Sequence, residues 1–293
     1  MTRHAAHSTI RRLTMLGLLI PGLAGAATTL TFLNFDDKSL SKPGWTFGAQ
    51  DGGSVTVSAD TSANLDGSAG SLKASYPLAT GQIYAWGVYD VSALNTYEVY
   101  VDFWAKMPNA KQGLKFLKIF GGDNNGVANT TFGLDYTGVD RGSMYQVSFG
   151  DGSAAYNDTQ NVINLDGSYP NWIGRSYGVA TVETPMRQAF HSSDWGTGWH
   201  HFRMRVKFNS GTTAANEKPD GAYYVEIDGK VYVNATGLFN RHYSNPPINS
   251  VALLNWSQTG TAPFDIWYDN VRISTGGFVD DVPPRAPSDV IVE

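Results

Sequence analysis

The sequence contains no cysteine and only five glutamates among its 293 residues. The lack of cysteine excludes disulfides, thiol nucleophiles and thiolate metal sites. Glutamate favours helices, whereas the 21 aspartates and 32 glycines favour turns, so the composition argues against a helical protein. Charged residues make up only 16% of the chain and the net charge is −5, which argues against general binding to nucleic acid.

Aromatic and apolar residues are abundant instead. The chain has 8 Trp, 15 Tyr and 14 Phe, and 42% of its residues are hydrophobic. A chain of this composition can bury a large core and is not disordered in its main part. No repeat of 20 to 50 residues is visible, which disfavours propellers and solenoids. The composition therefore predicts an all-β globular protein.

Residues 1–27 have the layout of a secretory signal peptide. Arg3, Arg11 and Arg12 give a positive start, residues 13–20 form an apolar centre, and small residues follow at 24–26. Removing the segment deletes three positive charges and no negative ones, so the charge falls to −8. No later segment approaches membrane-spanning length. We expect a secreted or periplasmic protein that has no membrane partner.

Short runs of strand-like residues, separated by turn clusters, follow from Leu30 to Ser274. Asp228-Gly229 between two such runs is a strong hairpin pattern. Continuous antiparallel strands over this length indicate one sandwich, which we place at residues 28–274, rather than two domains. The clearest expected strands are 30–35, 97–105, 114–120, 144–149, 199–208, 223–227, 230–233, 248–256 and 264–273.

Residues 275–293 have a different composition, with prolines at 283, 284 and 287. This segment is either a simple Pro-rich tail or a linker that leads to a truncated further module. We expect the protein to be a monomer.

The expected strand 199–208 alternates strictly between polar and apolar residues. His201, Arg203 and Arg205 share one face with Lys207, about 7 Å apart for successive members. If that face lines a groove, it suits an anionic sugar chain. A basic polar face is also the ordinary solvated side of an antiparallel sheet, and for Arg205 and Lys207 we favour that interpretation.

The other candidate residues are of the types that β-elimination from a uronic acid polymer requires. The reaction needs a cation or amide at the carboxylate, a base for the C5 proton and an acid for the leaving oxygen. Lys115 and Lys118 are expected on opposite faces of their strand, so at most one faces a given groove. Catalytic candidates are His201, Tyr177, His191 and Arg175; substrate-binding candidates are Arg203, Arg205, Lys115, Lys118, Gln146, Trp172 and Trp195.

Three segments, 199–208, 224–233 and 267–273, together resemble the concanavalin A-like lectin/glucanase superfamily, and most of all its secreted polysaccharide lyases. The resemblance implies a two-sheet antiparallel jelly roll whose concave sheet holds a polysaccharide. In similar domains an acidic first strand and an aspartate of the closing strand share a structural calcium. Asp36, Asp37 and Asp269 match that pattern, and calcium prefers such hard oxygen ligands.

Two catalytic patterns of that superfamily are absent. The laminarinase-type run Glu-x-Asp-x-x-Glu does not occur, and neither do the Arg-Ser/Thr-Glu-Leu/Val-Arg and Gln-Ile/Val-His strands of alginate lyases. Our preferred hypothesis is a lyase that cleaves an acidic polysaccharide. A non-catalytic carbohydrate-binding domain is the nearest alternative. A glycoside hydrolase, which needs two carboxyl groups across a groove, and a surface adhesion protein are further alternatives.

Overall fold

The computed structural model describes residues 26–77, 83–108, 114–121, 129–134, 145–150, 161–164, 181–182, 196–213, 215–238, 240–241, 246–257 and 263–279. For residues 114–115, 129–134, 145–150, 161–164, 181–182 and 254–257 it describes the backbone alone. Within these ranges the protein is all-β, with a single 3-10 turn at Ser92–Leu94 as its helical element. No helix in the described ranges is long and apolar enough to cross a membrane.

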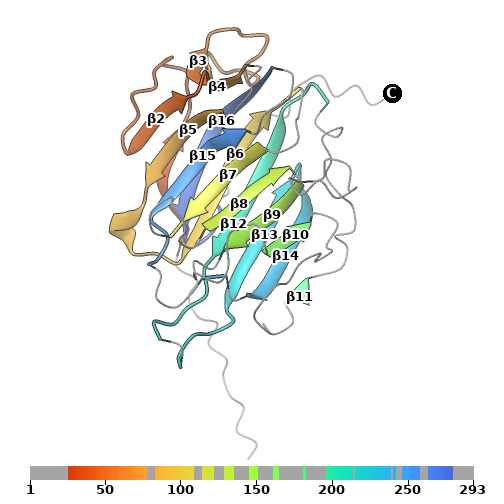
Figure 1. The fold of residues 1–293 in the computed structure, drawn as a ribbon. Helices are drawn as coiled ribbons and strands as arrows, with labels where there is room; N and C mark the ends of the chain where they lie inside the picture. Colours follow the sequence, from red (N-terminus) through yellow and green to blue (C-terminus); the bar gives the residue numbers. More distant parts are fainter. Residues whose placement is uncertain are drawn as a thin grey trace, which may run out of the picture.

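Two antiparallel sheets face one another (Figure 1). Sheet A has the strand order β11-β14-β13-β12-β6-β16-β4-β3, with β1 paired to the second half of β16. Its strands are β1 (Thr28–Leu33), β3 (Ser54–Ser58), β4 (Ser71–Tyr76), β6 (Glu98–Lys106), β11 (Thr181–Val182), β12 (His200–Lys207), β13 (Gly221–Ile227), β14 (Lys230–Leu238) and β16 (Phe264–Thr275).

Sheet B has the order β10-β9-β8-β7-β15-β5-β2 and forms the front layer in Figure 1. Its strands are β2 (Trp45–Gln50), β5 (Tyr84–Asp90), β7 (Leu114–Phe120), β8 (Asn129–Leu134), β9 (Tyr145–Gly150), β10 (Asn161–Asn164) and β15 (Ser250–Ser257). The two antiparallel sheets confirm the predicted jelly-roll sandwich.

The core lies between the sheets because alternate residues of each strand point inward. In β12 the inward residues Phe202 and Met204 are fully buried, and in β7 Phe116 is fully buried as well. The rings of Phe116 and Phe202 come from different sheets and lie 5.3 Å apart. Tyr268 of β16 also donates its hydroxyl to the carbonyl of Phe116 at 3.0 Å. Packing and a buried hydrogen bond thus join the two sheets at one point.

The hairpin expected at Asp228-Gly229 joins β13 to β14. Both turn residues have positive φ, 51° and 75°, as a two-residue hairpin turn of the favoured twist requires. Glycine adopts such a φ without strain, and aspartate is among the few other residues that tolerate it. The turn therefore sets the pairing of Ile227 with Lys230, and the register shifts further along the strands, between Val225 and Glu226 and between Gly221 and Ala222.

A bulge in β7 overturns one expectation. The register shifts between Lys115 and Leu117, so Lys115 pairs with Gly133 of β8 while Lys118 pairs with Thr131. These partners are two residues apart and so belong to one face of β8. The positions of Lys115 and Lys118 therefore belong to one face of β7 as well. The expectation that they lie on opposite faces is wrong, because it assumed an uninterrupted alternation.

Candidate functional site

The predicted site residues divide between two separate surfaces. His201, Arg203 and Arg205 belong to β12 of sheet A, whereas Lys118 belongs to β7 of sheet B. All four alternate with core residues of their strands and therefore belong to outward faces, those turned away from the core. The two outward faces are on opposite sides of the sandwich. One saccharide cannot contact both groups at once.

The outward face of β12 is a ladder of matched charges. His201 Nε2 lies 2.7 Å from Asp102 Oδ1 of β6, and Arg203 Nε lies 3.5 Å from the other oxygen of the same carboxylate. Arg205 Nε donates to Glu98 of β6 at 2.5 Å. Lys207 faces Asp220 at 3.4 Å. Each basic group on this face has an acidic partner in the structure, so the face carries little net charge for a polyanion to recognise.

Phe278, which follows β16, covers the middle of this ladder. Its ring centroid lies 4.2 Å from the guanidinium carbon of Arg203 and 5.0 Å from the ring of Tyr100. Hydrogen bonds hold the covering segment in place, from Ser274 Oγ to the carbonyl of Gly277 at 2.7 Å and from Arg272 to the carbonyl of Val279 at 3.2 Å. The sequence offered no indication of this contact.

Lys118 has a different environment on the outward face of sheet B. Its side chain is only 6% exposed although it does not belong to the core cluster, and its ammonium lies 4.6 Å from the ring centroid of Phe120. Phe120 is also buried, at 1%. A lysine is rarely buried to this extent. Lys118 and Phe120 thus place a little-exposed cation beside an aromatic ring on the outward face of sheet B.

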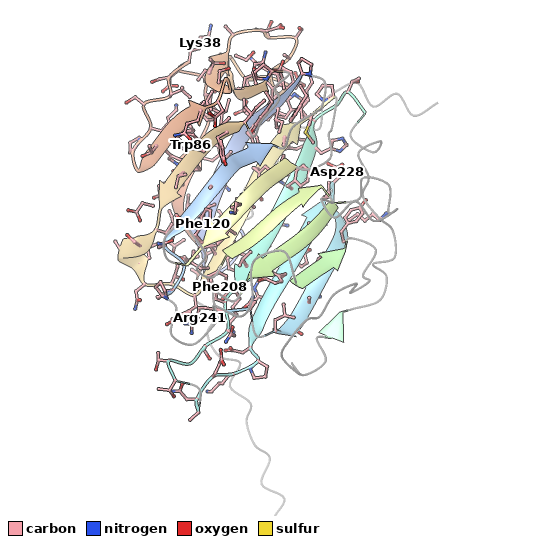
Figure 2. All side chains as sticks on the ribbon, viewed as in Figure 1. Lys38, Trp86, Phe120, Phe208, Asp228 and Arg241 are labelled. Atoms are coloured by element: carbon pink, nitrogen blue, oxygen red, sulfur yellow. The ribbon has the colours of Figure 1, made fainter. Side chains whose placement is uncertain are left out.

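Trp86 of β5 lies on the same sheet and was not among the predicted residues (Figure 2). It pairs with Gly48 of β2, and a Cβ atom built at Gly48 would come within 2.4 Å of the indole. The indole thus lies directly over the glycine backbone. A partly exposed, flat indole of this kind can stack on the C–H side of a sugar ring. No sequence pattern indicates this pairing, because Gly48 and Trp86 belong to different strands whose register is set by the fold.

The backbone register adds two more predicted residues to this part of sheet B. Lys115 of β7 pairs with Gly133 of β8, and Gly133 pairs with Gln146 of β9. Lys115 and Gln146 therefore occupy one row across three strands, next to the row of Lys118. The structure brings these three substrate-binding candidates into one neighbourhood. We refer to Trp86, Lys118 and Phe120, with the positions of Lys115 and Gln146, as the sheet B face.

Five predicted residues lie outside the described ranges. They are the catalytic candidates Arg175, Tyr177 and His191 and the substrate-binding candidates Trp172 and Trp195.

The residues expected to bind calcium do not form one uniform group. Asp269 is fully buried, and burial raises the pKa of its carboxyl, as does the nearby charge of Asp36. A cation would relieve the repulsion between these two carboxylates. Asp37 instead pairs with Lys42 at 2.7 Å and is 57% exposed, and the Lys42 hydrogen bond lowers the pKa of Asp37. Of the three expected ligands, Asp36 and Asp269 therefore act on one another electrostatically, whereas Asp37 is paired with Lys42.

Histidine and carboxylate side chains do not gather into a metal centre in the described part of the chain. The adjacent histidines of β12 bind different carboxylates. His200 Nδ1 lies 2.6 Å from Asp228 Oδ2, while His201 contacts Asp102.

Comparisons with known proteins identify the fold. No protein-family model matches the sequence, and a comparison with curated proteins finds no match. Among solved structures, the cellulose-induced protein Cip1 is similar, with a TM-score of 0.51 and 14% identity over 83% of this chain and 96% of that one. At this identity the similarity establishes the fold and no activity.

Two lyases of known structure are also similar. The alginate lyase Aly36B, solved with an alginate trisaccharide, has a TM-score of 0.49 and 14% identity over 83% of this chain and 96% of its own. An endo-β-1,4-glucuronan lyase from the fungus Trichoderma reesei has a TM-score of 0.48 and 13% identity over 85% and 96%. The similarity to Cip1 is one of fold and agrees with the predicted two-sheet antiparallel sandwich.

Proposed function

We propose that this protein is an exported polysaccharide lyase that cleaves an acidic, uronate-containing polymer on the sheet B face. The observation that carries the proposal is the buried ammonium of Lys118 beside Phe120. The sheet B face combines this cation with aromatic rings and with the positions of Lys115 and Gln146, which are the residue types that hold a uronate carboxylate and stack on sugar.

The chemistry follows from what β-elimination requires. Lys118 would neutralise the uronate carboxylate and so favour removal of the C5 proton. As that proton leaves, a C4–C5 double bond forms, the C4–O bond breaks and the leaving oxygen takes up a proton. Arg175, Tyr177 and His191 remain our proposed carboxylate binder and acid/base groups, and Trp172 and Trp195 remain proposed stacking residues.

The test follows the ultraviolet absorbance of the unsaturated uronic end that elimination creates. The mature chain is assayed with alginate, glucuronan, pectate and glycosaminoglycans in the presence of calcium. We expect a rise in absorbance with one polymer, and a loss of at least a hundredfold in Lys118→Met. Lys207→Met on the outward face of sheet A is the matched control and should retain full activity.

His201→Ala decides which face is used, because His201 was the leading catalytic candidate from the sequence. Activity that survives in His201→Ala and disappears in Lys118→Met supports the sheet B face. The reverse result would move the reaction to sheet A, and no absorbance rise with any polymer would exclude the lyase.

A non-catalytic carbohydrate-binding protein is the second candidate, and the position of Trp86 over Gly48 favours it. Stacking of sugar on this indole needs no acid or base. Retarded migration in a gel that contains one polymer, without any absorbance rise, would support this candidate. Trp86→Ala should then abolish the retardation.

We also propose a structural calcium ion held by Asp36 and Asp269. The proposal predicts that calcium chloride raises the melting temperature relative to EDTA, because binding to the folded state alone stabilises it. Asp36→Asn should remove the calcium effect, whereas Asp37→Asn should leave it intact. An unchanged melting temperature in the native chain would exclude the site.

Export and the monomeric state complete the proposal. Export rests on the pattern of residues 1–27 and predicts that the chain recovered outside the producing cell starts near residue 28. Light scattering of the mature chain would test the monomer.

A further inference from the structure

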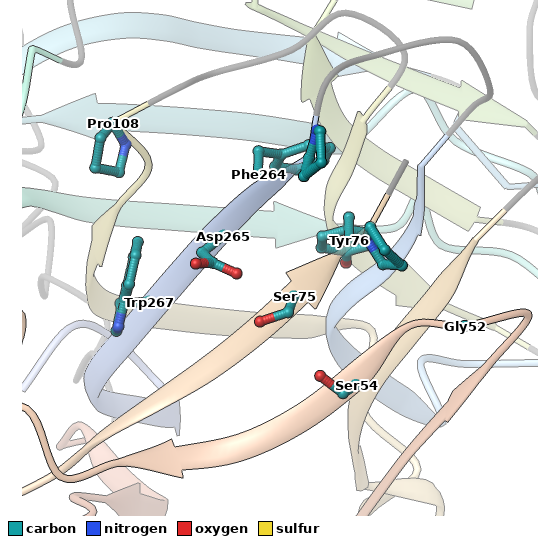
Figure 3. Close-up of a pocket in the computed structure, with 10 residues that line it drawn as sticks. Gly52, Ser54, Ser75, Tyr76, Pro108, Phe264, Asp265 and Trp267 are labelled. Carbon is teal, nitrogen blue, oxygen red and sulfur yellow. The ribbon is translucent and has the colours of Figure 1, made fainter. Parts of the chain in front are cut away.

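A pocket of about 330 Å³ lies on the outward face of sheet A, where β3, β4 and β16 meet (Figure 3). This volume is at the lower end of the usual range for ligand sites, about 300–1,000 Å³. Ser54, Ser75, Asp265 and Trp267 supply its polar and aromatic lining, and Pro108 and Pro263 contribute to it as well. We call this site the sheet A pocket.

The polar side of the pocket is built by the strand register. Ser54 of β3 pairs with Ser75 of β4, and Ser75 pairs with Asp265 of β16. Figure 3 shows the side-chain oxygens of the three residues in a row across the strands. Neighbouring strands are about 4.8 Å apart, so the row presents two hydroxyls and a carboxylate at regular intervals. Such a row can accept hydrogen bonds from several hydroxyls of one sugar ring.

The next row on the same face consists of Lys73, Trp267 and Lys106. The ammonium of Lys73 lies 5.3 Å from the centroid of the Trp267 ring, and that of Lys106 lies 5.6 Å from it. Lys73 also pairs with Asp265 at 2.9 Å. Both partners of this pair remain accessible, since their side chains are 30% and 32% exposed.

The charges decide the class of ligand. Asp265 is the only carboxylate among the ten described lining residues, and no lysine or arginine is among them. A uronate carboxylate in the pocket would therefore face the carboxylate of Asp265. The nearby ammonium of Lys73 is already paired with Asp265. The hydroxyls of a neutral sugar can instead donate to Asp265 and to the serine oxygens. Pro108 and Pro263 have no N–H to compete for these bonds and offer apolar contact to the C–H groups of the ring.

We infer that the sheet A pocket is a second saccharide site, which binds a neutral glycosyl residue independently of the sheet B face. The two sites lie on opposite sides of the sandwich. One molecule can therefore hold a neutral polymer with sheet A while sheet B contacts an acidic one. Attachment through one site raises the effective concentration of the other site near its own polymer when both occur in one matrix.

The experiment is affinity electrophoresis of the whole mature chain in native gels that contain hydroxyethyl cellulose, xylan, galactomannan or laminarin. We expect retardation in at least one of these neutral polymers. Asp265→Ala and Ser75→Val should each weaken the affinity about tenfold or more, as expected for loss of a hydrogen bond to a charged group or to a partly buried hydroxyl. Melting temperatures of both variants show whether they remain folded, and Ser54→Ala at the exposed edge is a milder third variant.

Two control variants separate this inference from the proposed function. Lys118→Met on sheet B and Lys207→Met on the distant ladder should migrate like the native chain in the neutral gels. Lack of retardation in all four polymers, or equal retardation of native chain and folded Asp265→Ala, would overturn the inference. Loss of retardation in Lys118→Met would also overturn it, because neutral sugars would then bind to sheet B. Failure of β-elimination on uronate polymers affects the proposed function alone.

Discussion

The hydroxyl of Ser71 donates to Asp269 Oδ2 at 2.7 Å, although the two residues are 198 positions apart in the sequence. Ser71 begins β4, and Asp269 lies in the neighbouring strand β16. The other oxygen of Asp269 accepts the N–H of Asn270 at 2.8 Å. These bonds hold a carboxylate in place at full burial.

Asp269 gives a prediction about stability and pH. Burial raises the pKa of Asp269 in the folded state, and the charge of Asp36 acts in the same direction, against the hydrogen bonds from Ser68, Ser71 and Asn270. A raised pKa means that the stabilising contribution of the protonated form is complete below the unfolded value, about 3.9, and is lost as the pH rises through the folded pKa. In EDTA, Asp269→Asn should therefore gain stability relative to the native chain as the pH rises from 4 to 7. Urea unfolding at several pH values measures this difference, and a constant difference would contradict the prediction.

Phe278→Ala should destabilise the folded protein by about 1–2 kcal/mol, because it removes the ring from Arg203 and Tyr100. Urea unfolding at neutral pH measures the loss. Leu94→Ala is a matched control, since Leu94 is 46% exposed and should change stability by less than about 0.5 kcal/mol. Equal effects of the two variants would show that the Phe278 ring contributes no more stability than an exposed side chain.

Arg241→Met should be more damaging, with an expected loss of about 2–4 kcal/mol. Arg241 is 1% exposed, and its guanidinium donates to the carbonyls of Asn209 at 3.1 Å and Gly211 at 2.6 Å. Methionine fills most of the volume but leaves both acceptors without this donor. Arg205→Met, which removes a partly exposed ion pair, should cost less than about 1 kcal/mol. A similar loss in both variants would contradict the role assigned to burial.

Gly48→Ala should weaken polysaccharide binding to the sheet B face without unfolding the protein. The new methyl group would lie 2.4 Å from the Trp86 indole, so the indole must move off the strand. Affinity electrophoresis with the acidic polymer that the native chain recognises should show a loss similar to that of Trp86→Ala. Gly198→Ala is the control, because a Cβ there meets no atom within 4 Å. Native-like binding by Gly48→Ala would exclude Trp86 as a sugar platform.

Local pattern was sufficient to predict much of the fold. The expected strand 114–120 is β7 to the residue, and 199–208 contains β12 with one extra residue at each end. The hairpin at Asp228-Gly229 also formed as expected, since both its residues tolerate positive φ. Strand β3 (Ser54–Ser58) was not among the clearest predictions although its residues alternate strictly between polar and apolar, because a five-residue run is short.

The arrangement of the site depends on long-range contacts that local pattern does not contain. The alternation of β12 predicts which residues share a face but not that β12 belongs to the sheet opposite Lys118. The bulge after Lys115 allows both Phe116 and Leu117 to join the core. No residue type in β7 indicates that a bulge occurs there. Phe278 was assigned to a linker by composition, whereas its position depends on Arg203 and Tyr100, which are distant in the sequence.

The pairing of β1 with β16 has a mechanical consequence. Thr28, the first residue of β1, lies opposite Thr275, the last residue of β16. A force that pulls on the two ends of the sandwich therefore acts at one end of this strand pair. The hydrogen bonds between β1 and β16 then break one after another, starting at that end, instead of all at once under shear. The sandwich should consequently yield to stretching at low force, starting with the detachment of β1.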